Sequence, residues 1–117
     1  MKEVVDFDEI LLNSIDEILS ILGENGKYAL FYHVEKSFQI KPSDIPEKLD
    51  DFHNAMEEFF GVGAKIVERL IAEKMYEKLG LAFRNRDGWT LKEYAENAQK
   101  TKDKWLMKER ERKKSKV

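Results

Sequence analysis

The sequence has 117 residues, a net charge of −2 and 38% charged residues, and it contains no cysteine. This length suits one domain around a single core, and the absence of cysteine excludes disulfides, thiolate zinc sites and a thiol nucleophile. Lys and Glu are abundant whereas glutamine occurs only at Gln39 and Gln99, a profile typical of a heat-adapted, thermophile protein. Because no apolar run reaches the length of a membrane span and the first residues lack the features of a signal peptide, we expect a cytoplasmic protein.

Hydrophobic periodicity predicts an all-α bundle of about five helices. Apolar residues recur every three or four positions from Phe7 to Leu22, where Gly23 ends the pattern. Residues 27–38 carry apolar side chains around most of the helix girth, so we expect this second helix to be central. Residues 39–49 contain both prolines, which predicts an ordered loop with Ile40 and Ile45 pointing inward.

The second half of the chain shows three further elements. A third helix is predicted over 49–60 and a fourth over 63–79, with Gly61 and Gly80 as stops. Alternating apolar residues around the turn 85–88 predict a small β-hairpin near residues 81–91. Thr90 and Glu93 form a capping box at the start of a fifth helix. We expect residues 1–107 to form a single helical domain, and residues 108–117 to be a basic tail that frays.

The stretch Gly61-Val62-Gly63 resembles a phosphate-binding loop only superficially. A dinucleotide fingerprint needs a preceding strand and a third glycine where Ile66 stands, and a Walker loop needs Ser or Thr after Lys65. We interpret the glycines as a helix break, with Gly61 in the left-handed region. The helix start that follows still offers free N–H groups to an anion, which leaves that alternative open.

No pattern in the sequence supports an enzyme. Asp50, His53 and Glu57 share a helix face, but no second histidine stands at a matching spacing, so we interpret them as a solvated acidic face without a metal. Adjacent carboxylates such as Glu57 and Glu58 point apart on a helix, and no serine lies in a nucleophile elbow. We therefore expect neither a catalytic residue nor a cofactor.

Charge is distributed unevenly along the chain. Residues 1–99 have a net charge of −8, and residues 100–117 have a net charge of +6. Sequence-independent contact with nucleic-acid phosphates is one interpretation of the basic end, through the cations Lys108, Arg110, Arg112, Lys113 and Lys114. The other interpretation is a solvated helix end whose cations oppose the helix dipole, and Glu109 and Glu111 within the run favour it.

Three stretches of the chain resemble a known archaeal module. They are residues 18–52, residues 59–81 and the aromatic position near the start of the last helix, and they are similar to the Nitrosopumilus output domain family over about residues 8–96. The resemblance depends on packing and helix-stop positions, namely Leu22-Gly23-Glu24, Glu35, Ile45-Pro46, Phe52, Phe60-Gly61, Ala64, Glu68 and Leu79-Gly80-Leu81. It implies a helical regulatory or signalling-output module of an archaeon, and it carries over no catalytic residue.

The end of the fifth helix suggests how such a module would interact. Trp105, Leu106 and Met107 are three large apolar residues among lysines, beyond what a compact bundle needs to cover. An exposed cluster of this kind usually has a partner, and tryptophan is a common interface anchor. We therefore expect an interaction module whose helix end packs on a second copy of the chain, most simply in a two-fold homodimer, or on a protein partner. The alternative is that the cluster folds back over the chain's own core.

Overall fold

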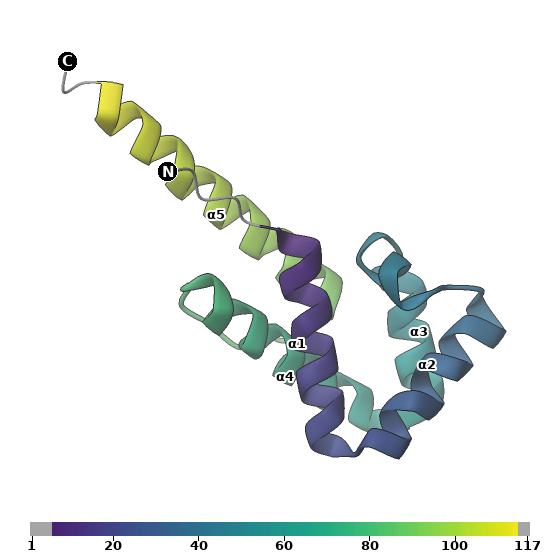
Figure 1. The fold of residues 1–117 in the computed structure, drawn as a ribbon. Coiled ribbons are helices and arrows are strands. Elements are labelled where there is room, and N and C mark those ends of the chain that lie inside the picture. Colours follow the sequence, from purple (N-terminus) through teal and green to yellow (C-terminus); the bar gives the residue numbers. More distant parts are fainter. Residues whose placement is uncertain (1–5, 115–117) are drawn as a thin grey trace.

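Five α-helices account for most of residues 6–114, the part of the chain that the computed structural model describes (Figure 1). Side chains are described to residue 111. Two short 3-10 helices complete the described secondary structure, which contains no β-strand and so confirms the all-α prediction. In chain order the elements are α1 (Phe7–Leu22), α2 (Glu24–Phe38), η1 (Pro42–Glu47), α3 (Leu49–Phe60), η2 (Gly61–Gly63), α4 (Ala64–Leu79) and α5 (Leu91–Lys114).

Helix α4 is the centre of the fold, and the expectation that the second helix is central is wrong. α4 packs against α1, α3 and α5, and it buries a continuous face along its whole length. α2 contacts α1 and α3 and buries only Lys27, Leu30 and Val34. Its Tyr28 and Tyr32 are 62% and 65% exposed, because aromatic residues one turn apart form a stripe that here faces solvent.

The helix ends follow local rules that the sequence already contains. The Asp6 side chain caps α1 by accepting a hydrogen bond from the Glu9 N–H at 3.1 Å. Gly80 ends α4 in the left-handed region. Gly61 ends α3 at φ 63° and ψ −133°, which has the expected positive φ but lies outside the left-handed helical region. Only glycine adopts such a conformation without strain.

The two irregular segments differ in how well the sequence predicted them. The proline-containing segment forms η1, and both Ile40 and Ile45 are fully buried, as expected. The predicted hairpin near residues 81–91 is wrong, because this segment forms no strand ladder. Its alternation has another cause: Leu81, Phe83 and Trp89 pack one side of an extended loop against the core.

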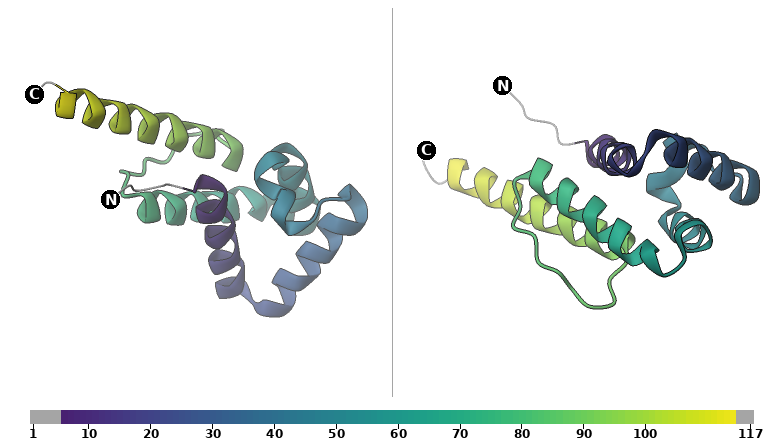
Figure 2. Two further views of the ribbon diagram at one scale, coloured as in Figure 1. Left: turned by 45° about the horizontal axis from the view of Figure 1, so that its top comes forward. Right: turned by 90° about the horizontal axis from the view of Figure 1, so that it is seen from below.

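Helix α5 is longer than expected. It continues past Met107 to Lys114, where we expected a tail that frays from residue 108. Residues 115–117 lie outside the described residues. Twenty-four helical residues span about 36 Å. α4 and α5 lie side by side, and the C-terminal part of α5 extends past the other helices (Figure 2). The molecule accordingly measures 55 × 28 × 23 Å.

The substitution Gly61→Ala tests the helix break. A Cβ at this position would meet no atom within 4 Å, so any cost comes from the positive φ alone. We expect a loss of about 1 kcal/mol in the free energy of unfolding, measured by urea denaturation. Gly63→Ala is the matched control, because Gly63 has φ −76° and equally open space. An unchanged or increased stability of Gly61→Ala would contradict the assignment.

Candidate functional site

The projecting end of α5 exposes the apolar cluster that the sequence singled out. Trp105 is 48% exposed and Met107 is 62% exposed, whereas Leu106 is half-buried. Lys102 makes a contact between this end and the body, since its ammonium group donates to the Leu79 carbonyl oxygen at 3.1 Å. The same group lies 4.7 Å from the centroid of the Trp105 ring, a cation–π contact that holds the indole in place. The fold thus presents Trp105 on a rigid helix.

Unpaired cations surround this cluster. Lys100, Lys104, Lys108 and Arg110 are exposed and form no ion pair with another described residue. Of the predicted nucleic-acid contacts, Arg112, Lys113 and Lys114 continue the helical backbone, and their side chains lie outside the described residues. The exposed end of α5 therefore combines large apolar groups with positive charge.

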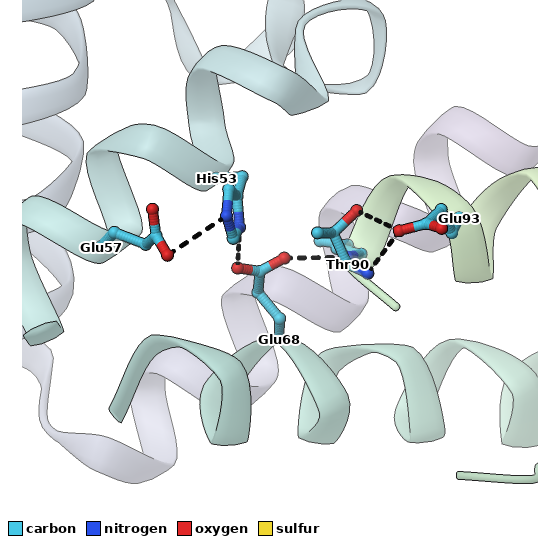
Figure 3. A network of polar contacts seen from close by, with 6 residues as sticks. His53, Glu57, Glu68, Thr90 and Glu93 are labelled. Atoms are coloured by element: carbon cyan, nitrogen blue, oxygen red, sulfur yellow. Dashed lines mark hydrogen bonds and ion pairs between the residues drawn. The ribbon is translucent and has the colours of Figure 1, made fainter. Parts of the chain in front are cut away.

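A buried carboxylate fixes the position at which α5 begins. Glu68 of α4 is only 2% exposed, and its Oε1 accepts a hydrogen bond from the Leu91 N–H at 2.8 Å (Figure 3). This N–H is one of the donors at a helix start that have no partner within the helix. The other oxygen, Oε2, lies 2.5 Å from Nδ1 of His53 on α3. One side chain thus connects three helices.

The neighbouring capping box forms in part. The Glu93 carboxylate accepts from the Thr90 N–H at 2.9 Å, as predicted. The Thr90 hydroxyl does not cap a backbone N–H; it donates to the same carboxylate at 3.2 Å (Figure 3). Together with Glu68, these contacts give the N–H groups of Thr90 and Leu91 carboxylate acceptors, which the helix dipole also favours.

Two tyrosines complete the attachment of α5 and of the preceding loop. The Tyr76 hydroxyl donates to the Tyr94 carbonyl oxygen at 2.8 Å and accepts from the Asn97 amide at 2.9 Å. Burial raises the pKa of Tyr76, so the neutral phenol needed for this donation persists. The Tyr94 hydroxyl accepts from the Arg86 N–H at 2.8 Å, which occupies a backbone donor that a hairpin would have used.

The proposed acidic face of α3 has specific partners. Asp50 lies 3.0 Å from the Lys92 ammonium, and their hydrogen bond raises the pKa of Lys92. His53 lies between Glu68 and Glu57, whose Oε2 is 3.4 Å from Nε2 (Figure 3). His33 is partly buried against Phe38 and Phe59 and contacts Glu58. Within residues 6–111, no three His, Asp or Glu side chains are arranged to hold a metal ion.

Sequence reasoning missed the role of Glu68, which it named only among the packing and helix-stop positions of the resemblance. A signal was present. Glu68 stands at the helical spacing of Ala64, Ile71 and Met75, which are all buried. A carboxylate on an apolar stripe must find a partner, and that requirement identifies it without an alignment.

Two of the surface hollows beside α5 differ in the charge of their rims. The first, about 310 Å³ and here named the α1–α5 pocket, is lined by Phe7, Asp8, Leu11, Pro46, Glu47, Leu49, Met75, Lys92, Ala95, Glu96 and Gln99. The second, about 350 Å³ and here named the basic hollow, is lined by Lys65, Ile66, Arg69, Asn85, Arg86, Asp87, Gly88, Trp89 and Tyr94. The first has a mainly acidic rim and the second a mainly basic one, so they suit partners of opposite charge.

Comparison of the chain with protein-family models, curated proteins and solved structures finds no match. The resemblance to the Nitrosopumilus output domain therefore stays a prediction. None of the described helices combines the length with the apolar character required to cross a bilayer.

Replacing Glu68 by alanine tests whether its hydrogen bonds stabilise the attachment of α5. The change leaves the buried Leu91 N–H without an acceptor and removes one of the two carboxylates that contact His53. We expect the free energy of unfolding to fall by about 2–3 kcal/mol. Glu73→Ala, at an exposed position of the same helix, is the control and should change stability little. If the two variants unfold at the same urea concentration, the contacts of Glu68 do not stabilise the attachment of α5.

Proposed function

We propose that the protein is a non-enzymatic interaction module that self-associates through the projecting end of α5. The observation that carries this proposal is the exposure of Trp105 and Met107 on a helix that extends past the rest of the fold. Exposed tryptophan is costly in a monomer and is enriched at the energetic centre of interfaces. The surrounding lysines keep the isolated chain from associating without specificity.

The rigid attachment of α5 supports the same role. Glu68 fixes its first residue and Tyr76 holds its second turn, so the helix does not need to order itself when it binds. Preorganisation of this kind reduces the entropic cost of association. Both histidines are engaged with glutamates, which favours a structural role for them over catalysis. With the resemblance above, this supports a regulatory or signalling-output role in an archaeon.

The substitution Trp105→Ala tests self-association. Sedimentation equilibrium of the parent chain is expected to show a dimer, and removal of the anchor should weaken it by about 30-fold or more. Alanine preserves helix propensity, so α5 should stay helical by circular dichroism. Lys100→Ala is the control at an exposed position of the same helix. A monomeric parent chain, or a dimer that Trp105→Ala leaves intact, would refute the proposal.

Nucleic-acid binding is the second candidate function. It is favoured by the cations of the basic hollow: Lys65, Arg69 and Arg86 form no ion pair within residues 6–111, and the Arg86 guanidinium stacks 5.2 Å from the Trp89 ring centroid. Cations beside an aromatic ring suit a phosphate backbone with a stacked base. The exposed Lys108 and Arg110 would extend the contact from the end of α5.

A salt series distinguishes this second candidate. Fluorescence anisotropy with a short labelled DNA should show affinity that falls steeply between about 50 and 200 mM salt. The double variant Lys108→Gln and Arg110→Gln should reduce the slope of log affinity against log salt by about 2. The control is Lys41→Gln with Lys48→Gln, which removes the same charge from exposed positions of the body. Equal losses in both double variants would indicate only a net-charge effect.

A further inference from the structure

The α1–α5 pocket has an apolar floor and unpaired negative charge at its rim. Leu11, Leu49 and Met75 are buried core residues that line it. Asp8, Glu47 and Glu96 also line it, and none of the three forms an ion pair with another described residue. Among the described residues that line the pocket, Lys92 is the one cation, and it is already paired with Asp50 at 3.0 Å. Its complement is therefore a large apolar group flanked by positive charge.

The end of α5 has that complementary chemistry. Lys102, Trp105 and Lys108 stand at three-residue steps, so they follow one another along one side of the helix. At about 310 Å³ the pocket falls at the small end of the range that accommodates ligands, a size suited to one aromatic side chain. The pocket therefore matches the Trp105 side chain in size, and its acidic rim matches the flanking lysines in charge.

A chain does not place its own Trp105 in its own pocket. Ala95, Glu96 and Gln99 of α5 line the pocket and Trp105 does not, because Trp105 lies six to ten residues further along the same continuous helix. A straight helix holds Trp105 about 9 to 15 Å beyond these residues. The body of a second copy supplies the same pocket without bending α5.

We propose that two copies dock reciprocally, with Trp105 of each chain seated in the α1–α5 pocket of the other. This proposal rests on the proposed self-association and names its acceptor surface. The exchange is isologous, so it closes at a dimer and does not propagate into a filament. It also brings the basic end of each α5 against the acidic body of the partner, which lowers the repulsion between two acidic bodies.

The experiment mixes two variants that are each expected to be monomeric. Trp105→Ala lacks the anchor but keeps its pocket, and Ala95→Trp fills the pocket but keeps its anchor. At a concentration where neither variant dimerises alone, sedimentation velocity of the equimolar mixture should show dimers, because one of the two contacts is intact. The mixed dimer should dissociate at least about tenfold more readily than the parent dimer, since it lacks the other contact.

A charge variant keeps the test decisive if Ala95→Trp fails to fold. Glu96→Lys reverses one charge at the exposed rim of the pocket and should weaken the parent dimer about tenfold at low salt, with the effect reduced at 1 M salt. Glu73→Lys, which makes the same change at an exposed position of α4 outside the pocket, is the control.

The outcomes separate the pocket from the proposed function. A dimer that Trp105→Ala breaks while Ala95→Trp and Glu96→Lys leave it intact would overturn the pocket and leave self-association standing. If both variants are monomeric and their mixture forms no dimer, Trp105 binds a surface other than the α1–α5 pocket. A parent chain that is monomeric at every concentration tested would overturn both, and would direct the search for a partner of Trp105 to other proteins.

Discussion

The buried Glu68 carboxylate determines how the two parts of the molecule meet. Its two oxygens bind the first backbone N–H of α5 and the imidazole of His53 on α3, from a position in the second turn of α4. A buried carboxylate is tolerated only while such partners are present. Each of the three helices therefore requires the other two, and the start of α5 has one position relative to the body. No described side chain buries a polar atom without a partner, so this arrangement carries no evident frustration.

That single attachment has consequences at a distance. Because α5 is one continuous helix, fixing Leu91 also fixes Trp105, which lies about 21 Å further along the axis. The tyrosine contacts of the second turn and the contact of Lys102 with Leu79 restrict rotation of the helix. The exposed cluster is thus held by buried interactions remote from it, and its orientation does not depend on a flexible connection.

The separation of charge acts together with this geometry. The body is acidic and the end of α5 is basic, and the stiffness of the helix keeps them apart within one chain. At physiological salt, charges interact over about 8 Å. The basic end is therefore attracted only weakly to its own body and can attract the acidic body of a neighbouring molecule. Charge of this kind speeds and orients association more than it strengthens it. The apolar cluster would supply the affinity.

The sequence by itself determined the helices and their stops, because these depend on interactions between residues three or four positions apart. Asp6, Gly23, Gly61 and Gly80 act locally, so reading them needed no tertiary information. Only the tertiary structure decided that α4 and not α2 is central, that 81–91 is a packed loop and that α5 continues to Lys114. The contacts of Glu68 with Leu91 and of Tyr94 with Arg86 likewise became visible only there. These features depend on how the apolar faces of different helices pack against one another, and that packing is determined by residues far apart in the sequence.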